Sequence, residues 1–223
     1  MQIETFSALQ GVDPATIGNY LCAVIDVIRA STTILCLMEH GAEEIQVVAT
    51  VEEALALKLR GYTPIGERGN LPLPGFTDNS PYLVSQHDWR SRRVVLTTSN
   101  GTRALVAVRD ARQIVVAAFR NLEAVARRLR ADPGPIGLVP IGSLGHPSYE
   151  DEACADALRR RLLGERVDFE AIRRKIFHDR AAQIERKGCQ FRHDIELALT
   201  LDATAIIPVL APGLVLRPTS FPR

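Results

Sequence analysis

The main indication of the fold class is the run Leu21-Cys22-Ala23-Val24-Ile25-Asp26-Val27. It is apolar apart from one aspartate and too short for an ordinary helix, so it indicates a strand. A strand that is apolar on both faces is typical of a parallel sheet covered by helices on both sides. The run therefore predicts an α/β protein in which Asp26 stands at the carboxyl end of a buried strand.

Similar short apolar runs alternate with helical patterns along the rest of the chain. Gly41 and Gly61 supply ends for the first two helices, and Asn121 is expected to cap a later one with its side chain. The alternation predicts a mostly parallel or mixed sheet with helices on both faces. Further strands are expected at 45–49, 94–98, 114–117 and 136–141.

The C-terminal part of the chain follows a different pattern. Residues 165–194 interleave both signs of charge, which predicts a solvated helix, and a second helix is expected from Asp194 to Leu201. A strand pair is expected at 205–209 and 214–216, and Pro208 places it at a sheet edge. We expect one domain over residues 1–223, with an organisation into two lobes or subdomains left open.

The composition limits the function classes. The chain has 223 residues, and its 27 basic residues nearly balance 26 acidic ones, for a net charge of +1. So small a charge argues against a general nucleic-acid or membrane-surface binder. The sequence has no apolar window long enough to span a membrane and no signal pattern, so a cytoplasmic protein is expected. The four cysteines show neither disulfide-framework nor zinc spacing.

Arginine supplies 24 of the 27 basic residues. GC-rich coding explains most of this excess, and arginine runs inside predicted helices are expected on solvated faces. Arg29, Arg68 and Arg103 differ because they follow predicted strands. A planar guanidinium at such a position can bind phosphate or sulfonate through two parallel hydrogen bonds.

The first strand opens directly into Asp26, Arg29, Ser31 and Thr32, at the place where ligands bind in open α/β sheets. An arginine and hydroxyl groups at a helix start form an anion site, for phosphate above all. An aspartate at its rim can bind Mg²⁺ or attack phosphorus. An equal alternative is that Ser31 caps the helix and Asp26 pairs structurally with Arg29.

The strand at 94–98 opens into a second polar turn, Ser99-Asn100-Gly101-Thr102-Arg103. Gly101 can adopt a positive φ and let an anion approach the backbone. Asn-Gly turns are common, so this turn alone is a weak signal. Two such junctions together indicate a ligand with two anionic groups, or one anion held from two sides.

Residues 66–81 contain three glycines and three prolines, which predicts a long irregular loop. Glu67 and Arg68 stand at its start, after a short predicted strand, and Asn79 and Ser80 lie near its end. A loop of this length is usually functional. The alternative is a surface loop with an incidental ion pair between Glu67 and Arg68.

Asp151 lies in an acidic helix start at 150–152, after a glycine-containing turn at 142–145. Capping is the default role there unless other carboxylates converge. With Asp26 and Glu67 it would offer the hard oxygen ligands that Mg²⁺ prefers. The sequence has no P-loop or dinucleotide fingerprint, and its five histidines show no catalytic or zinc arrangement. The residues thus predict Mg²⁺-assisted chemistry on a small, multiply anionic substrate.

These motifs make the sequence similar to the 2-phosphosulfolactate phosphatase family (ComB-like proteins). The similarity extends from about residue 2 to residue 209, and three ordered motifs with similar spacing make it specific. It rests on Val-Ile-Asp-Val-Ile-Arg-Ala-Ser-Thr-Thr at 24–33, Gly-Glu-Arg-Gly at 66–69, Gly-Phe at 75–76, Asn-Ser-Pro at 79–81 and Thr-Thr-Ser-Asn-Gly-Thr-Arg-Ala at 97–104.

The resemblance implies the ComB-like fold and an Mg²⁺-dependent phosphatase that hydrolyses (2R)-2-phospho-3-sulfolactate to 3-sulfolactate and phosphate. In methanogens this reaction feeds coenzyme M biosynthesis. A substrate with a phosphate, a sulfonate and a carboxylate would account for several arginines at strand ends. Arg68, with Asn79 and Ser80, would bind its sulfonate or carboxylate end. The oligomeric state stays open, a homodimer included.

A mechanistic hypothesis follows. Mg²⁺ is held by some of Asp26, Glu67 and Asp151 and bridges to the phosphate, while Arg29 and Arg103 stabilise charge on the phosphoryl group. Asp26 is either the nucleophile, which gives a phospho-aspartyl enzyme, or acts beside a directly attacking water. The expected substrate-binding residues are Ser31, Thr32, Arg68, Asn79, Ser80, Ser99, Asn100, Gly101 and Thr102.

Three positions depart from the family pattern. Asp78 and Asp156 stand where glycine is expected, and Pro140 stands where a small residue or cysteine is expected. Asp78 adds negative charge beside the predicted anion pocket, so it would alter substrate preference or add a metal ligand. Two alternatives therefore stay open: a phosphatase for another small phospho-acid, and a non-catalytic anion-binding protein of the same fold.

Overall fold

The computed structural model describes residues 1–6, 13–143 and 146–220, so part of the turn expected at 142–145 lies outside the described residues. The described strands are β1 (Ile3–Thr5), β2 (Leu21–Ile25), β3 (Ile45–Val47), β4 (Thr63–Arg68), β5 (Leu71–Pro72), β6 (Val94–Thr97), β7 (Gln113–Ala117), β8 (Ile136–Pro140), β9 (Ile206–Ala211) and β10 (Val215–Ser220). The described α-helices are α1 (Pro14–Ile17), α2 (Ala30–Glu39), α3 (Val51–Leu59), α4 (Pro81–Ser85), α5 (Gly101–Ala107), α6 (Leu122–Arg130), α7 (Tyr149–Leu163), α8 (Phe169–Lys187) and α9 (Cys189–Ala198).

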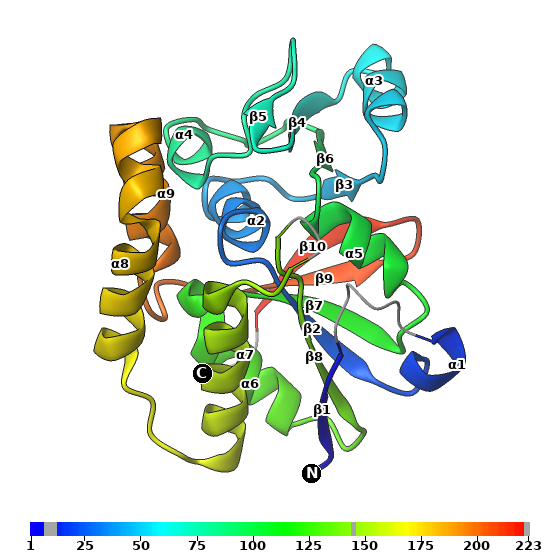
Figure 1. The fold of residues 1–223 in the computed structure, drawn as a ribbon. Helices are drawn as coiled ribbons and strands as arrows, with labels where there is room; N and C mark the ends of the chain where they lie inside the picture. Colours follow the sequence, from blue (N-terminus) through cyan, green and yellow to red (C-terminus); the bar gives the residue numbers. More distant parts are fainter. Residues whose placement is uncertain (7–12, 144–145, 221–223) are drawn as a thin grey trace.

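The described strands form one mixed sheet in the order β1-β8-β2-β7-β9-β10-β3-β6-β4-β5 (Figure 1). β1, β8, β2 and β7 form one parallel group, and β3, β6 and β4 form another. The antiparallel hairpin of β9 and β10 joins them. Its three successive antiparallel pairings reverse the second group relative to the first. The predicted mixed α/β architecture is confirmed, and the single domain over residues 1–223 stays a prediction.

Alternate residues of β2 pack into different cores, which explains why the run is apolar throughout. Leu21, Ala23 and Ile25 pack with α6 and α7 on one face, whereas Cys22 and Val24 pack with α2 and α5 on the other. The predicted helical cover on both faces of the sheet is therefore confirmed. Within the described ranges, none of the helices is long and apolar enough to cross a membrane.

The prediction that Pro208 marks a sheet edge is wrong. β9 lies between β7 and β10, and Pro208 stands opposite Pro218. In an antiparallel ladder, hydrogen-bonded residue pairs alternate with pairs that exchange no hydrogen bonds. Two opposed prolines fit a pair of the second kind, so the strands lose no backbone hydrogen bond to each other. On the other side, among the described residues, β9 pairs with β7 only at Val209 and Val115. Within the described sheet, no neighbouring strand therefore requires the N–H that Pro208 lacks.

Two helix starts also differ from the sequence predictions. Asn121 precedes α6, but its side chain turns back and accepts a hydrogen bond from Ala118 N (2.9 Å) instead of capping the helix. α9 begins at Cys189 rather than Asp194. Gly188, with a φ of 80°, ends α8 and lets the next helix start at once.

Candidate active site

A small pocket lies where the carboxyl ends of strands from both parallel groups meet. Residues that end or follow β2, β4, β6 and β8 form its walls, together with the first turn of α7. This location is the one expected for a ligand in an open α/β sheet. The lining residues are Asp26, Ile28, Arg29, Glu67, Asn70, Asn79, Thr98, Asn100, Gly142, Ser143, Ser148, Glu150 and Asp151.

Asp26 leaves the end of β2 and closes the first turn of α2. Its Oδ1 accepts a hydrogen bond from Ala30 N (3.2 Å), and its own N–H donates to Ser31 Oγ (2.9 Å). Ser31 therefore braces Asp26 rather than capping the helix. No ion pair joins Asp26 to Arg29 among the described residues, because Arg29 has other partners. The structural alternative for this junction is thus wrong in both of its parts.

Gly101 lets the start of α5 approach Asp26 closely. A Cβ at this position would lie 2.7 Å from Asp26 Oδ2 and 2.6 Å from Ala30 Cβ, so a larger residue would displace one of them. In the described part of the chain, no group donates a hydrogen bond to Asp26 Oδ2. Asp26 is buried and lines the pocket, so this oxygen faces the pocket with no partner from the described residues.

Asp151 uses both of its oxygens to hold the pocket wall together. Oδ1 accepts a hydrogen bond from Val27 N (2.7 Å), and Oδ2 accepts from Gly142 N (3.0 Å) and Ser148 Oγ (2.8 Å). The carboxylate thereby joins the end of β2, the loop after β8 and the start of α7. Among the described residues, no backbone N–H of α7 donates to Asp151, so the capping role expected by default is wrong, and the residue lines the pocket instead.

Glu67, like Asp151, uses both carboxylate oxygens to hold segments of the pocket wall together. Its Oε1 accepts a hydrogen bond from Ser99 N (2.7 Å), and its Oε2 accepts from Ser99 Oγ (3.1 Å) and Asn70 N (2.7 Å). These bonds fix the turn after β6 against the end of β4. Glu67 and Ser99 were both expected at the site, and the structure brings them into contact.

Arg68 turns away from the pocket. Its guanidinium donates to Glu67 O (2.7 Å), to Ala49 O (3.1 Å) and to Thr97 Oγ1 (2.7 Å). The alternative of an incidental Glu67–Arg68 ion pair is therefore wrong, since Arg68 bonds the backbone oxygen and not the carboxylate. Arg68 does not line the pocket.

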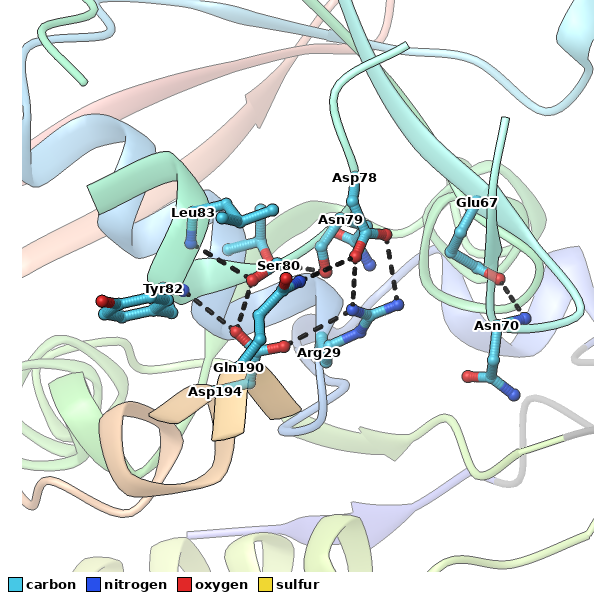
Figure 2. A network of polar contacts seen from close by, with 11 residues as sticks. Arg29, Glu67, Asn70, Asp78, Asn79, Ser80, Tyr82, Leu83, Gln190 and Asp194 are labelled. Carbon is cyan, nitrogen blue, oxygen red and sulfur yellow. Dashed lines mark hydrogen bonds and ion pairs between the residues drawn. The ribbon is translucent and has the colours of Figure 1, made fainter. Parts of the chain in front are cut away.

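Arg29 lines the pocket, and two aspartates bind its guanidinium (Figure 2). Nη1 lies 3.0 Å from Asp78 Oδ2 and 3.4 Å from Asp194 Oδ2, while Nη2 lies 3.4 Å from Asp78 Oδ1. Asp194 in turn accepts hydrogen bonds from Ser80 Oγ (2.5 Å) and Tyr82 N (3.1 Å). Asp78 and Asp194 thus fix the orientation of Arg29, and Ser80 belongs to this support.

Of the other predicted site residues, some line the pocket, some stabilise the backbone around it, and Arg103 does neither. Asn79 and Asn100 line the pocket, and Asn79 Oδ1 is buried without a hydrogen-bond partner among the described residues. Thr32 donates to Val27 O (2.7 Å), and Thr102 exchanges hydrogen bonds with Thr98 in the turn before α5. Arg103 is exposed on α5 and does not reach the pocket.

Sequence reasoning missed two acidic residues of the site. Asp194 is buried on the face of α9 that also carries Phe191, Ile195 and Ala198. A carboxylate at helical spacing within an apolar face is a signal that could have identified it. Glu150 was treated only as a cap, and no local pattern indicates that it lines the pocket and pairs with an arginine of α8.

Burial and mutual repulsion perturb the carboxylates of the pocket. The pKa of Asp26 is raised to about 7, chiefly by burial and also by the negative charges of Glu67 and Glu150, while the hydrogen bond from Ala30 N opposes the rise. Burial and the nearby charge of Asp26 raise the pKa of Asp151 well above its ordinary value. Crowded, buried carboxylates with raised pKa values are typical of functional sites.

These raised pKa values predict a pH dependence of stability in protein kept in chelator. Asp26 ionises near its ordinary pKa of 3.8 when unfolded but near 7 when folded, so the folded state binds more protons between these values. The free energy of unfolding should therefore fall as pH rises from about 4 to about 7. Urea unfolding across this range measures the fall, and Asp26→Asn should flatten it. An identical pH profile in the variant would contradict the assignment.

The oxygen donors of the pocket fit a hard divalent cation. Asp26 Oδ2 and Asn79 Oδ1 have no hydrogen-bond partner among the described residues, and carboxylates that crowd together are stabilised by a cation between them. Within the described ranges, no three carboxylate, histidine or cysteine side chains are arranged as a ready metal-ligand group. Mg²⁺ does not require one, because it commonly keeps several waters and binds through one or two carboxylates plus substrate phosphate.

Fold and site together define an α/β protein with a carboxylate-lined pocket at the ends of its strands. The sequence profile of the 2-phosphosulpholactate phosphatase family matches residues 8–213. The chain therefore belongs to the 2-phosphosulfolactate phosphatase family, as its motifs indicated. The activity named for this family is that of a phosphoric monoester hydrolase.

Individual relatives agree with the family assignment. A 2-phosphosulfolactate phosphatase of Methanothermobacter thermautotrophicus is 34% identical over 88% of this chain and 89% of its own. A probable 2-phosphosulfolactate phosphatase of Parasynechococcus marenigrum is 38% identical over 83% of this chain and 77% of its own. A probable one of Deinococcus radiodurans is 36% identical over 85% and 87%, respectively.

Proposed function

We propose that this protein is an Mg²⁺-dependent phosphatase that hydrolyses (2R)-2-phospho-3-sulfolactate to 3-sulfolactate and phosphate. Membership of the family supports the reaction and the substrate. The observation that carries the proposal is Asp26 Oδ2, which has no partner within the described ranges and lies in a pocket lined by three further carboxylates. Such a pocket repels phosphate unless a cation lies between the two.

Asp26 and Asn79 are the residues that would hold Mg²⁺, since each has an oxygen without a protein partner in the described part of the chain. Mg²⁺, when bound, would offset the negative charge that develops on the phosphoryl oxygens. Glu67 and Asp151 contribute charge and hold the backbone of the pocket wall through their hydrogen bonds. Arg29, oriented by its two aspartates, faces the same space.

Two routes stay open for Asp26. In the first, Oδ2 attacks phosphorus, the bond to the sulfolactate oxygen breaks, that oxygen takes up a proton, and water then hydrolyses the phospho-aspartyl enzyme. In the second, Asp26 accepts a proton from a water that attacks phosphorus directly, while the bond from phosphorus to the sulfolactate oxygen breaks and that oxygen takes up a proton. Acid-quenched protein from a single turnover should carry covalent phosphate on Asp26 in the first route only.

The ion pair of Arg29 with Asp78 favours a second candidate substrate class. Asp78 occupies both terminal nitrogens of Arg29 and so lowers its capacity to bind a further anion. A small phospho-acid with fewer negative charges than phosphosulfolactate would suit this arrangement. The two candidates share the chemistry and differ only in the substrate.

A phosphate-release screen tests the proposal. It compares phosphosulfolactate with other phosphorylated small acids, with and without Mg²⁺. Release that is fastest from phosphosulfolactate supports the first candidate, and faster release from a simpler phospho-acid supports the second. If no compound is hydrolysed, the pocket binds anions without catalysis and the proposal fails.

A further inference from the structure

A second, larger cavity of about 500 Å³ adjoins the carboxylate pocket. The two share Ile28, Arg29, Asn70 and Ser143 in their walls. The far wall of the larger cavity is the C-terminal half of α8, which in Figure 1 lies beside α9. A ligand in the carboxylate pocket can therefore extend toward this helix.

The α8 wall is basic, in contrast to the acidic pocket. It carries Arg180, Arg186 and Lys187. Neither Arg186 nor Lys187 pairs with a carboxylate in the part of the chain that the structure describes. Burial and the neighbouring charges of Arg29 and Arg186 lower the pKa of Lys187. These cations repel one another, and an anion between them would relieve that repulsion.

The other arginines near the site already have partners. Arg29 is bound by Asp78 and Asp194. Arg180 donates to Glu150 and, through Nη1, to Gln183 Oε1 (2.9 Å). The contact with Glu150 holds α8 against the carboxylate pocket. Arg68, the residue expected to bind the sulfonate or carboxylate end, is bound by three backbone or hydroxyl oxygens on another side.

The smaller cavity is thus acidic, whereas the larger cavity has a cationic wall that suits a second anionic group of the substrate. Four carboxylates line the smaller pocket, so a second anionic group of the substrate would be repelled there. Next to it stands the α8 wall, in which Arg186 and Lys187 have no carboxylate partner among the described residues. An anion held by Arg186 would gain charge-assisted hydrogen bonds that this side chain does not make within the described chain.

We propose that Arg186 and Lys187 bind the non-phosphate anion of the substrate, a sulfonate or a carboxylate, while the phosphate occupies the carboxylate pocket. This inference rests on the proposed function. It makes these two residues determinants of specificity rather than catalytic residues. Binding of the sulfonate or carboxylate end, which the sequence predicted for Arg68, is thereby assigned to residues of α8.

Steady-state kinetics of Arg186→Gln test this proposal with three substrates. Phosphosulfolactate carries a carboxylate and a sulfonate, 2-phospholactate carries only the carboxylate, and isopropyl phosphate carries neither. We expect kcat/KM for phosphosulfolactate to fall about 10-fold more than that for isopropyl phosphate, mainly through KM. A comparable fall for phospholactate assigns the carboxylate to Arg186, and a smaller one assigns the sulfonate. Arg174→Gln removes an exposed charge of α8 outside the cavity and is the matched control.

Equal effects of Arg186→Gln on all three substrates, or effects no larger than those of Arg174→Gln, overturn the proposal. If the wild type hydrolyses none of the substrates, the proposed function fails separately. Titration calorimetry with 3-sulfolactate then decides the inference. Binding that Arg186→Gln weakens about 10-fold supports it, and unchanged or absent binding overturns it.

Discussion

Replacing Asp26 with asparagine is expected to lower kcat for phosphate release on the order of 10³-fold or more. The amide keeps an oxygen that can accept the hydrogen bond of Ala30 N but removes the charge that would hold Mg²⁺ and attack phosphorus or accept a proton. The loss should therefore appear in kcat at saturating substrate. Stopped assays of released phosphate at saturating Mg²⁺ measure it.

Two controls separate this loss from misfolding. Asp156→Asn changes an exposed aspartate of α7 whose one ion-pair partner in the described part of the chain is Arg160, and it should leave kcat unchanged. Asp26→Asn should unfold at the same or a higher urea concentration than the wild type at pH 8, because it removes a buried charge. A stable Asp26→Asn protein with near wild-type kcat would refute the assignment of Asp26.

Replacing Asp151 with alanine is expected to lower the free energy of unfolding by about 3–5 kcal/mol. The substitution leaves Val27 N and Gly142 N buried without an acceptor and removes the partner of Ser148 Oγ. Each unsatisfied buried donor costs about 1–3 kcal/mol. Equilibrium urea unfolding at neutral pH gives the difference directly.

The control for Asp151→Ala is a substitution at another aspartate of α7. Asp156→Ala breaks an exposed pair with Arg160 and should cost less than about 1 kcal/mol. Asp151→Asn keeps one acceptor oxygen and should fall between the two. If Asp151→Ala and Asp156→Ala were equally stable, the hydrogen bonds of Asp151 would not hold the pocket wall as described.

The sheet and the edge that carries the site were predictable because they depend on local patterns. The apolar run at 21–27 is buried on both faces, as its composition requires, and Asp26 follows it at the strand end. Glu67 and Asp151 also line the pocket, since strand ends and helix starts converge in this class of sheet. Their location at the pocket could therefore be predicted without knowing their hydrogen-bond partners.

The partners of the arginines were not predictable, because they lie far away in the sequence. Asp78 and Asp194 are 49 and 165 residues from Arg29, and no local pattern joins them. Arg68 and Arg103 occupy strand-end positions similar to that of Arg29. Arg68 nevertheless finds backbone oxygens outside the pocket, and Arg103 faces solvent. Position at a strand end therefore did not determine the direction of the side chain.

The reversal of the second parallel group was also hidden from the sequence. It depends on which strands pair with the late hairpin of β9 and β10. Pro208 favoured an edge position, yet an opposed proline made an interior position compatible. Pairing between distant strands depends on the whole sheet, and single-residue propensity gives little information about it.

Magnesium titration of phosphate release tests the central claim most directly. The purified protein is first treated with chelator, and the initial rate of phosphate release from (2R)-2-phospho-3-sulfolactate is then measured as Mg²⁺ is added in excess. Almost no release is expected in chelator, with a saturable recovery as Mg²⁺ is added that Asp26→Asn fails to show. Release that proceeds at the full rate in chelator, or no release at any Mg²⁺ concentration, would contradict the assignment of Mg²⁺-dependent phosphatase activity to this pocket.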